Sequence, residues 1–102
     1  MITLVRTANM NDGQAMAGLA WAVKVATYIT ENLGVDVQVA RNVGGPVNQV
    51  HWMANYDSLA DFDAAMKRLL NDEGYMELVA EAQEARFYES NSIVDRLYES
   101  MG

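Results

Sequence analysis

The strongest constraint on the fold is a pair of segments in which apolar and polar residues alternate on either side of one turn. Residues 35–39 read Val-Asp-Val-Gln-Val, and residues 50–56 read Val-His-Trp-Met-Ala-Asn-Tyr. Alternation with a period of two is typical of strands that bury one face. Gly44, Gly45 and Pro46 lie between the segments and favour a turn. The sequence therefore predicts a β-hairpin. Gly44–Gly45 lacks the lysine of a phosphate-binding loop, so this function is excluded for the turn.

Residues 14–33 show the three-and-four spacing of apolar residues that is typical of a helix. We expect Asn11 or Asp12 to cap its start by accepting backbone N–H groups. Gly34 is expected to end it, because glycine adopts the left-handed conformation at low cost. The buried face is predicted to comprise Met16, Leu19, Ala20, Val23 and Ala26, with Trp21, Val25, Tyr28 and Ile29 widening the apolar stripe.

A second helical region follows the hairpin. Ser58 precedes it and Asp61 stands three residues later, which is a near match to a capping box. Residues 71–74 interrupt the pattern, and a further helix is predicted over residues 75–85. The residues expected to face inward from the first part are Leu59, Phe62, Met66 and Leu69.

Two further strands are predicted, over residues 2–8 and residues 92–98. The complete order describes a split βαβ, or ferredoxin-like, arrangement with a four-stranded antiparallel sheet, which is an α+β fold. A length of 102 residues corresponds to one domain, residues 1–102. A single layer of helices covers one face of such a sheet, so we expect a second copy to cover the other face in a homodimer.

Composition excludes several function classes. The chain has no cysteine and one histidine, so it offers neither a thiolate site nor a multi-histidine metal site. Its formal charge of −7 disfavours nucleic acid as a partner. No apolar stretch reaches the length of a membrane span, and residues 1–10 do not resemble a secretion signal. We expect a cytoplasmic protein that binds no membrane.

Alternation divides the hairpin side chains between two faces. The apolar set, which we assign to the helix side, comprises Val35, Val37, Val39, Val50, Trp52, Ala54 and Tyr56. Gln38, His51 and Asn55 then point the other way, into the space between two subunits. His51 is the one side chain whose unperturbed pKa lies near neutrality, so it is the candidate general base. The alternative is a hydrogen-bonded histidine with a structural role.

Four aromatic residues and two arginines are the candidate ligand contacts. Trp21, Tyr28, Trp52 and Tyr56 are spaced so that they could line a pocket for a flat organic molecule between the helices and the sheet. The alternative is that they are plain core residues. Arg6 and Arg41 lie on predicted strands, where a guanidinium needs an anion. That anion is either a ligand group or an internal partner such as Asp36 or Asp95.

Residues 45–62 read Gly-Pro-Val-Asn-Gln-Val-His-Trp-Met-Ala-Asn-Tyr-Asp-Ser-Leu-Ala-Asp-Phe and resemble the NIPSNAP-like domains. In these domains a strand ends in an aromatic residue before a helix that starts like "YxSLxxF". The later step Asp72-Glu73-Gly74-Tyr75 resembles the "DxxY/W" of the next helix. The resemblance implies a dimeric α+β barrel, the superfamily that also holds antibiotic-biosynthesis and haem-degrading monooxygenases. Because that superfamily hosts several activities, the resemblance points to a fold more than to a reaction.

The haem-degrading members are known for an asparagine on the first strand, a tryptophan late on the third strand and an iron-ligating histidine on a later helix. Asn9 matches the first loosely, Tyr56 stands where the tryptophan would be, and no histidine follows His51. The haem site therefore has no match here. We expect the protein to carry no haem, no transition metal and no other cofactor.

Three functions stay open at this stage. The leading one is binding of a small hydrophobic or aromatic molecule. The second is a cofactor-independent monooxygenase or isomerase that acts on an aromatic or polyketide-like substrate, with His51 or an arginine handling charge. The third is a non-catalytic dimerisation module. An enclosed cavity favours the first two, and a filled interior favours the third.

Overall fold

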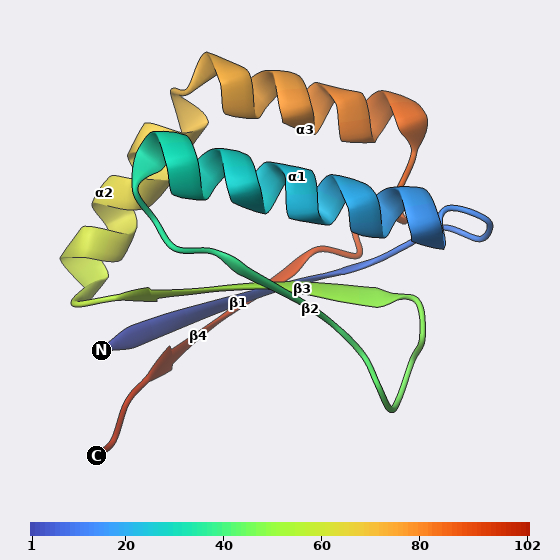
Figure 1. Ribbon diagram of the computed structural model, residues 1–102. Helices are drawn as coiled ribbons and strands as arrows, with labels where there is room; N and C mark the ends of the chain where they lie inside the picture. Colours follow the sequence, from blue (N-terminus) through green and yellow to red (C-terminus); the bar gives the residue numbers. More distant parts are fainter.

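Seven elements follow one another in the computed structural model, which describes residues 1–102. They are β1 (Ile2–Asn9), α1 (Ala15–Leu33), β2 (Gln38–Arg41), β3 (Gln49–Tyr56), α2 (Leu59–Leu70), α3 (Glu73–Ala85) and β4 (Val94–Glu99). The strands form one antiparallel sheet in the order β2-β3-β1-β4, and the helices lie on one side of it (Figure 1). This confirms the predicted α+β class and the ferredoxin-like topology with a four-stranded antiparallel sheet.

The predicted facing of the β3 side chains is confirmed. Val50 and Ala54 are buried beneath the helices. Trp52 lies between them on the same side, and its Nε1 donates to the carbonyl oxygen of Ala22 in α1 at 3.1 Å. Tyr56 packs edge-on against Phe62 of α2. The alternation therefore identifies which side chains of this strand meet the helical layer.

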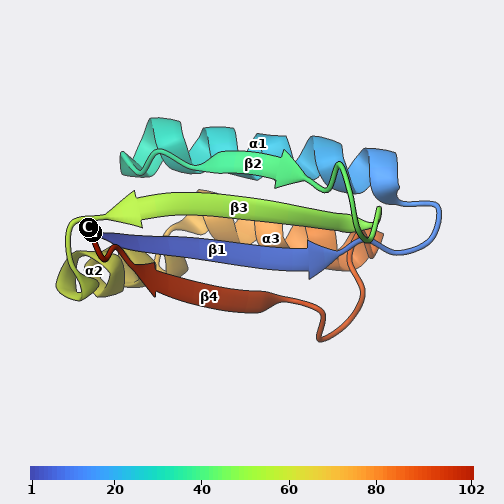
Figure 2. The ribbon, with the colours of Figure 1, turned by 90° about the horizontal axis from the view of Figure 1, so that it is seen from below.

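The opposite face of the sheet has no cover in one chain, as Figure 2 shows. β4 is an edge strand, and all six of its residues are exposed. Leu97 pairs with the buried Leu4 and so belongs to the helix side, yet it is 45% exposed. The helices therefore stop short of β4.

The start of β2 differs from its prediction, because the strand begins at Gln38 rather than at residue 35. The Val37 N–H instead donates to the Thr30 hydroxyl.

Two helix starts carry the side-chain caps that their sequences suggest. Ser58 Oγ accepts from the Asp61 N–H, which confirms the predicted cap of α2. Asp72 accepts from the Tyr75 N–H, so α3 begins at Glu73 rather than at residue 75. Both caps satisfy backbone donors that a helix end leaves unpaired.

The predicted start of α1 is confirmed to within one residue, but the predicted side-chain cap by Asn11 or Asp12 was wrong. Its N-cap residue is Gln14, and no side chain caps it. The Asn11 side chain instead donates to the carbonyl oxygens of Arg86 and Tyr88 at 2.9 and 3.0 Å. Asn11 is thus used to hold the chain after α3, a contact between residues far apart in sequence. The predicted end of the helix is confirmed, because Gly34 adopts the left-handed conformation with φ of +70°.

The buried face of α1 also differs from the prediction. It consists of Gly18, Trp21, Ala22, Val25 and Ala26. Met16 and Val23, which were predicted to be inside, are 85% and 55% exposed. Apolar residues surround most of this helix, so their spacing fits two faces equally well. Leu59, also predicted to face inward, is 58% exposed at the first turn of α2.

Two small clusters of mutually packed residues stand out among the buried side chains. One comprises Ala8, Met10, Ala22 and Val50, and the other comprises Trp21, Val25 and Ala82. Trp52 and Tyr88 pack against both clusters. Space is left between the helices and the sheet beside these two residues. None of the three helices combines the length and apolar character that a membrane span needs.

Candidate functional site

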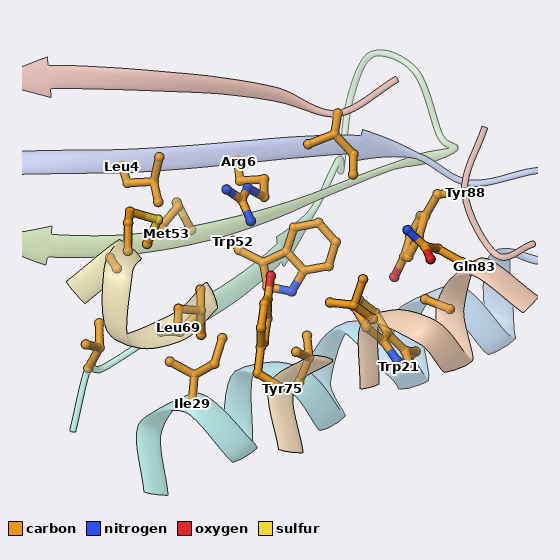
Figure 3. Close-up of a pocket in the computed structure, with 18 of the residues that line it drawn as sticks. Leu4, Arg6, Trp21, Ile29, Trp52, Met53, Leu69, Tyr75, Gln83 and Tyr88 are labelled. Carbon is orange, nitrogen blue, oxygen red and sulfur yellow. The ribbon is translucent and has the colours of Figure 1, made fainter. Parts of the chain in front are cut away.

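A cavity of about 1060 Å³ lies between the helical layer and the sheet. Of the 26 residues that line it, 19 are hydrophobic, and they come from β1, β3, all three helices and the segment after α3. Figure 3 shows Trp21, Ile29, Leu69 and Tyr75 directed from the helices into the same space as Leu4, Arg6 and Trp52 of the sheet. The two layers are therefore held apart at this point.

Three aromatic side chains form one wall of the cavity. The rings of Trp21, Trp52 and Tyr88 meet edge-to-face, with centroid separations of 6.2 Å between the indoles and of 5.7 and 5.8 Å to the tyrosine. This is the preferred geometry for aromatic pairs. Their polar atoms are all used: Trp21 Nε1 donates to the Leu78 carbonyl at 3.0 Å, and the Tyr88 hydroxyl donates to the Gly18 carbonyl at 2.7 Å. The wall is thus rigid and presents mainly carbon to the cavity.

Arg6 supplies charge to this apolar space. It lies on the central strand β1, and the register places it directly between Trp52 of β3 and Asp95 of β4. Its Nε and Nη2 atoms donate to the two carboxylate oxygens of Asp95 at 2.7 and 2.9 Å. Those hydrogen bonds raise the pKa of the Arg6 guanidinium, and the nearby Tyr75 acts in the same direction. The sequence-based alternative of an internal pair with Asp95 is therefore confirmed, and Arg6 still lines the cavity.

The structure brings together some of the predicted ligand contacts and separates others. Arg6, Trp21, Trp52 and Tyr56 line the cavity. Burial raises the pKa of Tyr56, partly offset by the positive charge of Arg6. Tyr28 lies outside the cavity because its hydroxyl donates to Asp72 Oδ2 at 2.5 Å. Arg41 is also outside, exposed at the end of the edge strand β2.

His51 lies on the opposite face of the sheet, away from the cavity. Asn42 uses its Nδ2 to donate to the Pro46 carbonyl and to Gln49, so its Oδ1 is free to accept from His51 Nε2 at 2.5 Å. The Thr7 hydroxyl then donates to Nδ1 at 2.7 Å. Both ring nitrogens are occupied, and no carboxylate orients the ring. This environment suits a structural histidine better than a general base.

Gln38 and Asn55 share that face with His51, as the alternation predicts. Together with Thr3, Asp36 and Met53 they line a shallow hollow of about 260 Å³. The Asn55 side chain accepts from the Thr3 hydroxyl at 2.7 Å. The structure gathers no group of three or more His, Asp or Glu side chains that could hold a metal ion. The expectation of no cofactor stays a prediction.

Sequence reasoning missed two of the aromatic residues that line the cavity, Tyr75 and Tyr88. Tyr75 begins a detectable pattern, because Tyr75, Val79 and Ala82 are spaced as one helix face and all three line the cavity. Tyr88 gave no such signal. It follows α3 in an irregular segment, and contacts with distant parts of the chain hold it, such as its bridge to Met10 and its ring contact with Trp52 of β3.

Comparison with known proteins identifies similarity in family and in fold. The NIPSNAP family model matches residues 8–94. A search of curated proteins finds no match.

Among solved structures, an uncharacterised NIPSNAP domain protein from Burkholderia xenovorans superposes with a TM-score of 0.81 at 16% identity, over 98% of this chain and 94% of that one. A NIPSNAP family protein of unknown function from Agrobacterium tumefaciens gives a TM-score of 0.79 at 20% identity, over 98% and 87%. A cofactor-independent oxygenase from Streptomyces nogalater gives a TM-score of 0.69 at 12% identity, over 99% and 93%. At these identities the likeness establishes the fold alone.

Proposed function

Since the chain belongs to the NIPSNAP family, and its structural neighbours share the fold without a common assigned activity, we propose a function from the cavity of this chain. The protein binds a small, flat, predominantly apolar molecule between the helices and the sheet. The observation that carries this proposal is a cavity of about 1060 Å³ with 19 hydrophobic residues among its 26 lining residues. Ligand sites in proteins are concave, mostly apolar and of comparable size, with a few polar groups that fix orientation.

The shape of the lining favours a planar ligand. Trp21 and Trp52 stand nearly perpendicular, with an angle of 86° between their planes. A flat molecule can lie against the face of one ring while its edge meets the other, which is favourable for aromatic groups. Several residues at the far end, among them Gln83, Arg86 and Ser90, are exposed and also line the cavity. We assign the entrance to this end.

The two alternatives fit less well. A dimerisation module needs no internal space, and this chain retains space that the packing of two core clusters leaves open. An oxygenase or isomerase needs a group that handles charge beside its substrate. The sheet separates His51 from the cavity, so Arg6 is the remaining candidate for that role in an oxygenase or isomerase.

We also propose that the protein is a cytoplasmic homodimer. The support is the sheet face opposite the helices, which one chain leaves uncovered (Figure 2). Two sheets can pack face to face, so a second copy of the chain can cover this face. The cavity lies on the helix side, so the binding of a ligand and the pairing of two sheets use different faces.

Fluorescence titration with phenyl-α-naphthylamine tests the binding proposal, because this neutral aromatic probe brightens in apolar surroundings. Wild-type protein is expected to bind it saturably at one site per chain. Val79→Phe places a ring in the cavity and should weaken binding by about tenfold or more, since a filled site cannot accept the probe without strain. Leu59→Phe, on an exposed position of α2 outside the cavity, is the matched control and should bind as wild type. Absence of saturable binding, or equal binding by both variants, would contradict the proposal.

A further inference from the structure

One end of the cavity holds hydrogen-bond donors that the chain itself does not use. Arg6 donates to Asp95 through Nε and Nη2. A guanidinium has further N–H groups, among them those of Nη1, which these two hydrogen bonds do not use. Arg6 stands in the middle of the sheet, beside Trp52, on the side that faces the helices. The guanidinium plane is fixed by its two-pronged contact with Asp95, so the direction of the free N–H groups is fixed as well.

Tyr75 approaches the same place from the opposite wall. It is a residue of α3, and Figure 3 shows its ring directed toward the sheet, with the hydroxyl pointing past Trp52 toward Arg6. The hydroxyl lies beside the guanidinium and acts on it as an acceptor, which helps to raise the pKa of Arg6, and no buried side-chain nitrogen or oxygen is left without a partner. An accepting hydroxyl keeps its own O–H, so Tyr75 can still donate into the cavity. The hydroxyl of Tyr88 in the aromatic wall, by contrast, is already bonded to the Gly18 carbonyl.

The charge balance restricts what these donors can hold. Asp95 already neutralises Arg6 in a bidentate pair, and the chain as a whole carries a formal charge of −7. A ligand carboxylate would lose its hydration here without meeting an uncompensated positive charge. A neutral carbonyl oxygen has two lone pairs, loses far less on leaving water and needs only donors.

We propose that the ligand carries a neutral carbonyl oxygen on its ring system, and that Arg6 Nη1 and the Tyr75 hydroxyl both donate to it while the rings lie against Trp52. This inference rests on the proposed function and names the ligand class of the same cavity. Asp95 acts as a positioning residue, because it holds the guanidinium without facing the ligand. The apolar remainder of the cavity supplies affinity, and the two donors select for the oxygen.

A matched set of small molecules tests this selection. α-Tetralone and tetralin share one carbon skeleton and differ by a carbonyl in place of a methylene group; a third compound carries a carboxylate on the same ring carbon of tetralin. Calorimetric titration should give about tenfold or tighter binding of α-tetralone than of tetralin, because a hydrogen bond to a charged donor in an apolar site has an effect of this order. The carboxylate should bind no tighter than tetralin.

Two variants and one control locate the effect. Tyr75→Phe and Arg6→Met should each reduce the preference for α-tetralone to within about threefold and leave the affinity for tetralin unchanged, since each removes one donor and keeps the apolar contact. Tyr98→Phe removes a hydroxyl from an exposed residue of β4 outside the cavity and should keep the full preference. Tyr75→Phe retains its ring, so it carries the test alone should Arg6→Met fail to fold.

Each outcome decides between the two proposals. If neither tetralin nor α-tetralone binds, the proposed function fails. If both bind wild type with equal affinity, the cavity binds apolar molecules and the inference of a carbonyl ligand is overturned. The inference is also overturned if the preference survives in Tyr75→Phe, or if the carboxylate binds most tightly and loses its affinity in Arg6→Met.

Discussion

At the scale of single residues, Trp52 joins the two layers and also forms a wall of the cavity. Its indole N–H donates to the Ala22 carbonyl of α1, and its ring meets those of Trp21 and Tyr88. The neighbouring His51 points the other way and has only two local partners, Thr7 and Asn42. Adjacent residues on one strand therefore serve two different faces of the molecule.

Replacing these two neighbours should affect stability very differently. Trp52→Ala removes a large aromatic side chain that packs against both core clusters, and it should lower the free energy of unfolding by about 3–5 kcal/mol. His51→Ala removes two hydrogen bonds near the surface and should lower it by about 1–2 kcal/mol. Urea titrations of both variants measure the difference. Equal losses, or a larger loss for His51→Ala, would show that the sheet faces are assigned the wrong way round.

Whether a cavity residue could be predicted from sequence depends on how far along the chain its contacts lie. Alternation along β3 was enough to place Trp52 and Tyr56 on the helix side, where both line the cavity. Tyr28 has an equally apolar helical context, but its hydroxyl is drawn out of the cavity by Asp72, which lies 44 residues further along the chain. Nothing in the sequence near Tyr28 indicates that partner. Tyr88 was missed for the same reason, because distant contacts alone fix its position.

At the scale of elements, the start of α3 is tied to α1 through one carboxylate. Asp72 accepts both from the Tyr75 N–H at 2.9 Å and from the Tyr28 hydroxyl of α1. Gly74 makes this possible, since a Cβ atom at that position would overlap the Tyr28 ring and hydroxyl. The contact fixes the position of α3, and Tyr75 enters the cavity from that helix.

This contact predicts a pH effect of known sign. The hydrogen bond from Tyr28, and then that from the Tyr75 N–H, lower the pKa of Asp72 below its ordinary value of 3.8. A carboxylate with a lowered pKa stabilises the folded state above its unfolded pKa, and the contribution disappears as the pH falls through the folded pKa. In Tyr28→Phe the pKa of Asp72 should rise toward 3.8, which NMR titration of the carboxylate measures. An unchanged pKa in this variant would exclude Tyr28 as its main cause.

Elements were predictable where the decisive signal lies within a few residues. The Ser58 cap and the Gly34 stop depend on local backbone groups, and both were identified from sequence. The cap of α1 was not, because Asn11 bonds to the carbonyls of residues that follow α3 instead of capping the helix. The buried face of α1 was misassigned at Met16 because tertiary packing, not spacing, chooses between two apolar faces.

At the scale of the whole molecule, the two faces of the sheet have different tasks. The helix side contains the cavity, and the other side carries Thr7, His51 and Asn55 together with apolar residues. β4 extends this open side, with Tyr98 51% exposed. A sheet face of this kind, in a chain with one helical layer, is the basis of the proposed homodimer.

Sedimentation at micromolar concentration tests that assembly. The expected species has twice the chain mass of 11.3 kDa. Tyr98→Arg on the open face should shift it toward monomer, because a charge buried without a partner is unfavourable at an interface. Leu70→Arg, on an exposed position of α2, is the control and should leave the dimer intact. A stable monomer of wild-type protein would contradict this proposal, while the cavity proposal would stand.

The central claim is that the space between helices and sheet is a binding site, and the two indole N–H signals in a proton–nitrogen NMR spectrum test it most directly. The chain has only two tryptophans, and both line the cavity. On titration with α-tetralone, both indole signals should shift and saturate together, while the backbone signals of His51 and Asn55 on the opposite face stay in place. Indole signals that do not move up to the solubility limit of the ligand, or shifts confined to the opposite face, would contradict the claim.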